Sequence, residues 1–185
     1  MVRKLFYALA ITLLTVSFAA AEKVKSPATE KQEKKEEKPK REPIVDTFTR
    51  IDQGEAGVDA LVIYAHPLYF AYKGLVEDAK KKYDMEKFHV FIVTINSQKK
   101  ADLSKFKIES SIFIRTEESL EYPAVSQWIP LTETPSKRTG VVRFFQIDAN
   151  KNKVLKDNAK SFEVIIKGLA DVPERIFKWK LPIEF

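Results

Sequence analysis

The chain has 185 residues, of which 44% are hydrophobic and 31% charged, and its formal net charge is +6. This length suits about one domain with a sizeable core. The charge excess is too small to favour nucleic acid or an anionic lipid surface as a partner. The absence of cysteine excludes disulfides and a lipid anchor on cysteine, so a folded domain must be stabilised by its core.

Residues 1–21 have the pattern of a secretory signal peptide. Arg3 and Lys4 precede an apolar run of 14 residues from Leu5 to Phe18, and three alanines then stand before Glu22. The run is shorter than the roughly 20 residues that span a bilayer, which favours a signal peptide over an uncleaved anchor. We therefore expect a periplasmic or secreted protein with no integral membrane segment after cleavage.

Residues 22–43 are built from Glu, Lys, Pro, Ser, Thr and Gln, with Val24 and Ala28 as the only apolar side chains before Ile44. A segment this poor in apolar groups cannot offset the entropy of ordering, so we expect a disordered charged linker. Contact of its lysines with peptidoglycan or another anionic surface is the alternative. The Lys- and Glu-rich composition also predicts a thermophilic source.

Residues 44–185 are expected to form one domain, centred on the stretch from Lys87 to Arg115. In the strand predicted at 88–95 both faces are apolar, which is typical of a central strand covered on each side. A strand at 59–66 precedes it and ends at Pro67. The aromatic run 68–72 could continue as an edge strand, and the spacing of Leu75, Ala79 and Tyr83 predicts one short helix over 74–83.

The strands predicted later in the chain lie at 110–115, 125–129, 141–147, 162–167 and 177–181. The last two alternate cleanly, with Phe162, Val164 and Ile166 facing inward and Glu163 and Lys167 outward. Strands separated by turn signals, with a single helical pattern, predict an all-β fold. The specific expectation is an immunoglobulin-like antiparallel β-sandwich with one short helix.

Several short motifs run through the domain: Phe88-x-Val90 with Asn96, Asp102-Leu103, Ile114-Arg115, Thr139-Gly140-Val141 with Phe144, Ser161-Phe162-Glu163-Val164 with Ile166, and Val172-Pro173-Glu174-Arg175 with Phe177 and Trp179. In these residues the domain resembles an uncharacterised family of small secreted bacterial proteins, a domain of unknown function. The resemblance implies an immunoglobulin-like sandwich and no known activity. At two places where members of that family carry histidines, this chain has Ser97-Gln98-Lys99 and Ser136-Lys137-Arg138, whose lysines and arginine cannot replace imidazole ligands.

The two histidines are weak candidates for a metal site. His66 and His89 lie on neighbouring predicted strands, and Met85 is near in sequence, so a copper or zinc site can be considered. No cysteine supplies a thiolate, and the spacing matches no ligand pattern. We therefore assign no metal and no cofactor, and keep a periplasmic metal-handling protein as the alternative function.

Catalytic and calcium signals are weak. Asp148-x-Asn150-x-Asn152 opens like a calcium loop, but it lacks the glycine and the final glutamate, so a polar turn is favoured. The carboxylates of Glu117, Glu118 and Glu121 suggest a cell-wall glycan hydrolase by residue type alone. Neither a nucleophile elbow nor a phosphate-binding glycine loop is present, and we predict that the protein is not an enzyme.

The best functional lead is the aromatic run of Tyr64, Tyr69, Phe70 and Tyr72. If these side chains are exposed they could line a groove or contact a partner, whereas burial beneath the short helix is the favoured alternative. The resulting prediction is a secreted or periplasmic, non-catalytic binding module whose partner is another envelope protein.

Overall fold

The computed structural model describes residues 43–183 apart from 72–73, 100–101 and 126–127. The predicted signal peptide and nearly all of the linker lie outside the described residues.

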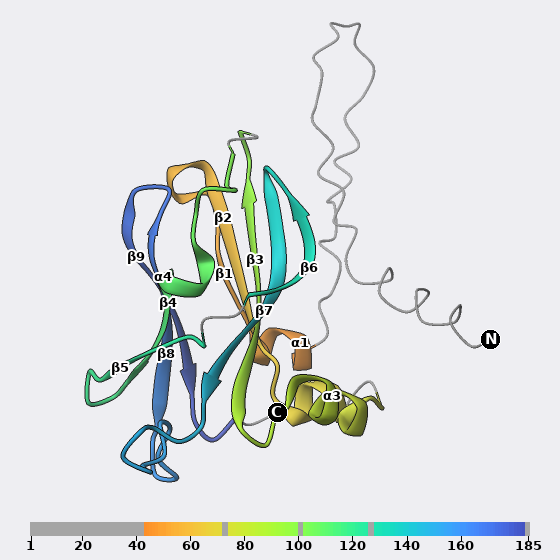
Figure 1. Cartoon of the computed structure of the whole chain (residues 1–185), viewed down its shortest axis with the longest axis vertical. Coiled ribbons are helices and arrows are strands. Elements are labelled where there is room, and N and C mark those ends of the chain that lie inside the picture. The colour runs from red at the N-terminus through yellow and green to blue at the C-terminus, as the bar shows by residue number, and fades with distance from the viewer. Residues whose placement is uncertain (1–42, 72–73, 100–101, 126–127, 184–185) are drawn as a thin grey trace, which may run out of the picture. The chain divides into compact units, whose positions relative to one another are not determined.

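The described residues form two sheets of antiparallel strands (Figure 1). The prediction of an antiparallel all-β domain is therefore confirmed. The five-stranded sheet has the order β1 (Thr49–Asp52), β2 (Val58–Tyr64), β3 (Phe88–Ser97), β7 (Lys137–Phe145), β6 (Ile129–Thr134), and the four-stranded sheet β5 (Glu121–Pro123), β4 (Ile112–Thr116), β8 (Ser161–Leu169), β9 (Val172–Lys180).

Short helices connect the strands. The helix predicted over 74–83 is present as α3 (Val76–Tyr83), and α1 (Pro43–Phe48), α2 (Pro67–Ala71), α4 (Ile108–Ser111) and the 3-10 turn η1 (Glu55–Gly57) were not predicted. The edge strand predicted over 68–72 is wrong. Pro67 begins a helix there, because its fixed φ and missing N–H suit the first helical position.

β3 is the third of five strands, as its two apolar faces predicted. Phe91, Val93 and Ile95 are fully buried, and Val90 on the opposite face is 1% exposed. The Lys-rich connection after β3 crosses to the other sheet, so β4 pairs with β8 rather than with β3. The strand predicted at 125–129 starts later, at Ile129, and Pro130 lies inside β6 because an edge strand tolerates proline.

Aromatic rings from both sheets form the middle of the core. Tyr64 stacks on Phe91 at a centroid distance of 4.9 Å, and Phe162 stacks on Trp179 at 5.3 Å. Tyr64 meets Phe162 edge-on at 5.3 Å, which joins the two sheets. Each such ring buries about 150–250 Å², so this cluster is a main source of the domain's stability.

One side of the sandwich is closed by polar contacts from the edge strand β9 to residues of α1, β1 and β2. The side chain of Arg175 is fully buried and donates to Asp52 Oδ2 at 2.7 Å and to the carbonyl of Val58 at 2.8 Å. Trp179 Nε1 donates to the carbonyl of Phe48 at 3.2 Å. On the other side of the five-stranded sheet, β6 is an edge strand whose pairing with β7 shifts register between Pro130 and Thr132.

A ring of four charged side chains covers the outer face of the four-stranded sheet. Arg115 pairs with Glu121 at 2.6 Å and with Glu174 at 2.8 Å, and Lys167 pairs with the same two carboxylates at 2.6 and 3.6 Å. Lys167 Nζ lies 4.8 Å from the centroid of the Phe113 ring. Ile165 beside Phe113 is fully buried although it points away from the other sheet. We call the four charged residues the charge ring; they are Arg115, Glu121, Lys167 and Glu174.

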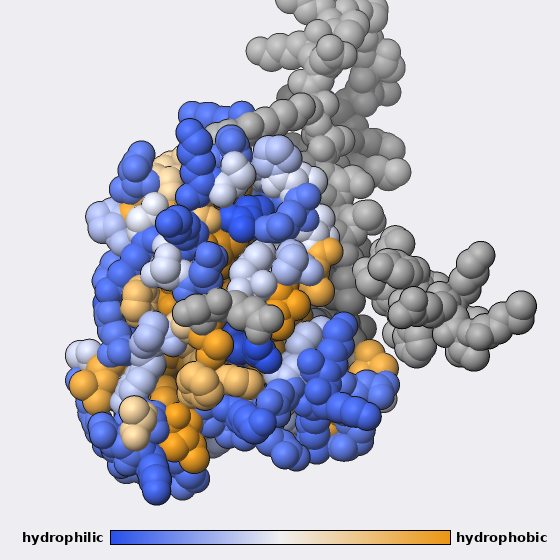
Figure 2. All heavy atoms as spheres, viewed as in Figure 1, coloured by the Kyte–Doolittle hydropathy of each residue, from blue (hydrophilic) through white to orange (hydrophobic). Residues whose placement is uncertain are grey.

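The surface shown in Figure 2 carries small hydrophobic patches separated by hydrophilic side chains. Among the exposed hydrophobic residues are Leu131, Phe145, Ile147 and Ile176, each about half exposed. In the described part of the chain, no helix has the length and apolar character needed to cross a membrane.

Candidate functional site: a pocket at one end of the sandwich

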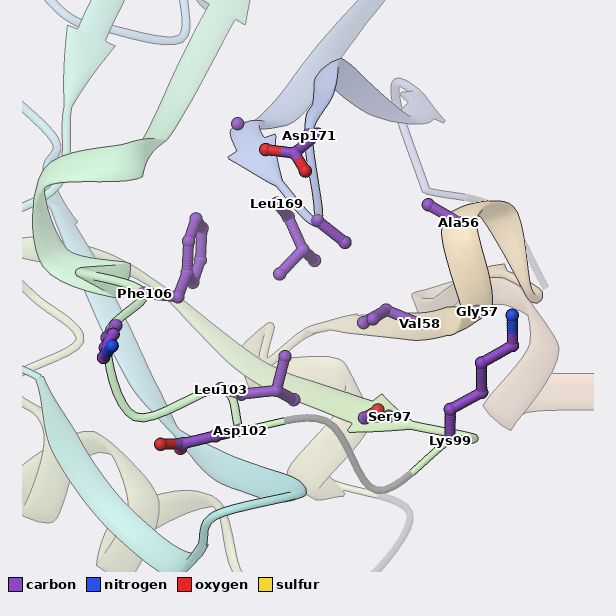
Figure 3. A pocket seen from close by; sticks show the side chains of 13 residues that line it. Ala56, Gly57, Val58, Ser97, Lys99, Asp102, Leu103, Phe106, Leu169 and Asp171 are labelled. Atoms are coloured by element: carbon purple, nitrogen blue, oxygen red, sulfur yellow. The ribbon is translucent and has the colours of Figure 1, made fainter.

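A pocket of about 590 Å³ opens where β2 begins and β3 ends (Figure 3). Three separate loops form it: the η1 turn, the connection from β3 to α4, and the β8–β9 hairpin. Its described lining is Ala56, Gly57, Val58, Ser97, Lys99, Asp102, Leu103, Lys105, Phe106, Gly168, Leu169, Ala170 and Asp171. We call it the end pocket. A volume of this size is in the range of ligand sites.

Apolar side chains make the floor of the end pocket. Val58, Leu103 and Leu169 are at most 6% exposed, and Phe106 is partly buried against the core. In Figure 3 the side chains of Leu103, Phe106 and Leu169 approach the same space from two sides. Phe106 therefore supplies most of the apolar surface that a ligand could reach in this pocket.

The turns around the pocket hold left-handed backbone conformations without glycine. Ala56 has φ 51°, and Ala170 and Asp171 at the tip of the β8–β9 hairpin have φ 54° and 63°. A side-chain-bearing residue in this region costs about 1–2 kcal/mol. Three of the six such residues among those described line this one pocket, so unfavourable backbone conformations are concentrated at its rim.

Arg138 of β7 fixes the wall that carries Leu103 and Phe106. Its Nη1 donates to the carbonyl of Phe106 at 2.6 Å and to that of Leu103 at 3.3 Å. The guanidinium also pairs with Glu133 at 2.9 Å and lies 5.7 Å from the centroid of the Trp128 ring. Sequence reasoning missed this role, because nothing in the spacing of Arg138 relates it to a loop more than thirty residues earlier.

Charges of both signs surround the apolar floor. Lys99 and Lys105 contribute ammonium groups, and Asp102 and Asp171 contribute carboxylates. Hydrogen bonds from Ser104 are the main cause that lowers the pKa of Asp102, and the nearby Lys105 acts in the same direction. An apolar centre with a mixed charged rim resembles the anatomy of protein–protein contacts.

The two histidines lie at the opposite ends of β2 and β3 from the end pocket, and both contact Tyr64. The ring of His66 is 5.3 Å from that of Tyr64, and the Tyr64 hydroxyl lies 3.4 Å from His89 Nδ1. His66 Nδ1 accepts the Leu68 N–H at 3.2 Å, which places the proton of the neutral ring on Nε2. The described residues contain no group of three or more His, Cys, Asp or Glu side chains that could hold a metal ion.

The aromatic run proposed as a contact surface is packed in the core. Tyr64, Tyr69 and Phe70 are between 5% and 9% exposed, and Tyr72 lies outside the described residues. Phe70 stacks on Tyr83 of α3 at a centroid distance of 6.1 Å. This supports the alternative that the run packs beneath the short helix.

The remaining candidate residues make local polar contacts. Asp148 Oδ1 accepts the N–H groups of Asn150 and Asn152 at 2.8 and 2.9 Å, which is the geometry of a polar turn. Glu117 accepts hydrogen bonds from the Lys160 N–H and the Ser161 hydroxyl. Glu118 pairs with Lys156, and Glu121 belongs to the charge ring.

Comparisons of the chain with protein-family models, with curated proteins and with solved structures found no match. The site must therefore be interpreted from its own chemistry.

Proposed function

We propose that this protein is a non-catalytic interaction module of the cell envelope or exterior, with an immunoglobulin-like sandwich as its scaffold. The crossings of the chain between the two sheets after β3, β5 and β7 support such a scaffold. Recognition loops gathered at one end of a sandwich are a common arrangement for binding. The end pocket, formed by three such loops, is the observation that carries the proposal.

The partner that suits the end pocket is an extended segment of another protein. Its apolar side chain would lie on Phe106 and the accessible edge of Leu103, and its flanking charges would face Lys99 and Asp171. A rim of both signs disfavours a polyanion such as nucleic acid. Because the hydrogen bonds of Arg138 hold the pocket wall in place, little ordering entropy is lost on binding.

Peptide selection tests this proposal. Random peptides displayed on phage are selected on the purified full-length protein, and the selected peptide is titrated into ¹⁵N-labelled protein. We expect shift changes at the η1 turn, at the connection after β3 and at the β8–β9 hairpin. Phe106→Ala should weaken binding about tenfold or more, as loss of a central contact does.

Ile176→Ala is the matched control, because Ile176 is 52% exposed on the outer face of the four-stranded sheet and does not line the pocket. Equal loss of affinity in both variants would contradict the proposal, as would failure of any peptide to be enriched over an unrelated sandwich domain.

The proposed location rests on residues 1–21 and has its own test. Expression of the full chain in a bacterium should yield exported protein whose N-terminal residue is Glu22, measured by intact mass after fractionation. Retention of the full-length chain in the cytoplasm would contradict it.

A further inference from the structure

We propose that His66 and His89, joined through Tyr64, form a clasp that holds α2 on the sandwich only while both imidazoles are neutral. The clasp is a feature of the fold itself, and it lies at the opposite end of β2 and β3 from the end pocket.

The first part of the clasp is a histidine that caps a helix. His66 immediately precedes α2, and its Nδ1 accepts the N–H of Leu68, the second residue of that helix, at 3.2 Å. An N-terminal cap requires a side-chain acceptor at this position. Imidazole meets that requirement only when Nδ1 carries no proton, since both nitrogens of the charged ring are donors.

The second part is the packing around the capping ring. His66 stacks on Phe48 at a centroid distance of 6.0 Å and meets Tyr64 edge-on at 5.3 Å. Phe48 is fully buried and Tyr64 is 6% exposed. A proton added to His66 would therefore place a charge against the end of the aromatic core and remove a hydrogen bond at the same time.

The third part is His89, whose Nδ1 lies 3.4 Å from the Tyr64 hydroxyl. Burial lowers the pKa of His89 to about 4, and the neighbouring His66 adds to this effect. Burial also lowers the pKa of His66.

The neighbouring titratable groups are Tyr64 of β2 and Tyr69 of α2. Burial raises the pKa of both hydroxyls, so both stay neutral in acid. Two arginines lie near this group: the guanidinium of Arg50 of β1 lies over Trp179, which in turn contacts Tyr64, and that of Arg143 of β7 lies over Phe88, the residue before His89.

The sign of the pH effect follows from these directions. Each histidine has a lower pKa in the folded protein than its ordinary 6.5, so the unfolded chain binds protons first as the pH falls. The stabilisation is complete above about pH 6.5 and is lost as the pH falls toward 4. For His89 alone the shift corresponds to a loss on the order of 100-fold in the folding equilibrium constant. Acidification should therefore loosen α2 first, because its cap is one of the two titrating groups.

The test compares variants of the full-length protein that keep the hydrogen bonds but cannot titrate. His66→Asn retains a good capping acceptor, and His89→Gln retains a polar partner for Tyr64. Urea unfolding is measured at several pH values between about 7 and 4.5, where wild-type stability should fall more steeply than that of either variant. The double variant should show the shallowest dependence. Amide exchange protection at Leu68 and Tyr69 should decrease on acidification before protection in β8 and β9.

Direct titration keeps the proposal falsifiable if a variant does not fold. The ring protons of both histidines in the wild-type protein, followed by NMR, should report pKa values below 6.5, and His66 should be the Nε2–H tautomer. Ordinary or raised pKa values for both rings would overturn the proposal, as would identical pH slopes in wild type and double variant.

Discussion

At the residue scale, Gly140 shows how the interior of the sandwich depends on a missing side chain. A Cβ atom at this position would lie 2.5 Å from Trp128 Cζ2 and 2.6 Å from the Ile129 carbonyl oxygen. The carbonyl belongs to the neighbouring strand and cannot move aside without disturbing β6. We therefore expect Gly140→Ala to lower the free energy of unfolding by roughly 3 kcal/mol, measured by urea denaturation.

Gly74→Ala is the control for this substitution. Gly74 has φ +66°, but a Cβ atom added there would meet no atom of the described residues within 4 Å, so we expect only the backbone cost of about 1 kcal/mol. An equal loss in both variants would show that the collision with Trp128 is not the cause.

At the element scale, the charge ring acts as a cover for Phe113 on the outer face of the four-stranded sheet. Its side chains are only 22% to 36% exposed, so its pairs are screened less than surface pairs. Arg115→Met should lower the free energy of unfolding by about 1–2 kcal/mol at low salt. This loss should become smaller near 1 M NaCl, because the Debye length there is only about 3 Å and salt screens the ion pairs. Thermal unfolding at the two salt concentrations measures both effects.

Lys153→Met is the matched control, because Lys153 and Asp157 form an exposed pair in a turn, with side chains 57% and 83% exposed. We expect a change below about 0.5 kcal/mol there. A loss in Arg115→Met that is no larger, or that does not respond to salt, would contradict the covering role.

Elements with strong periodicity were predictable from the sequence, and those fixed by tertiary contacts were not. The alternation in β8 and β9 and the two apolar faces of β3 specify strands by themselves. β1 has four residues of intermediate burial, and its position depends on Arg50 and Asp52 reaching the opposite sheet. The end pocket was not predictable for the same reason: its lining comes from three loops that only the folded chain brings together.

At the scale of the whole molecule, the pair of Asp52 and Arg175 joins the two sheets. Asp52→Asn should lower stability by roughly 3 kcal/mol, because the fully buried guanidinium then loses this counter-charge. Since the link lies between the sheets, wild-type protein should unfold in one transition. Far-UV circular dichroism and tryptophan fluorescence, to which Trp128 and the buried Trp179 both contribute, should give the same midpoint in urea.

Asp157→Asn serves as the reference, since that carboxylate is largely exposed and should change stability little. Separate midpoints for the two signals in wild-type protein would mean that the sheets unfold independently.

The offset in the pairing of β6 also bears on how copies of the molecule behave together. A straight outer strand would offer neighbouring molecules a regular series of amide donors and carbonyl acceptors. Pro130 removes one amide donor from that series. The register shift between Pro130 and Thr132 makes the spacing of the remaining donors and acceptors irregular. Addition of a further strand at this side is therefore disfavoured, which protects a protein without disulfides against fibril growth during any transient loosening.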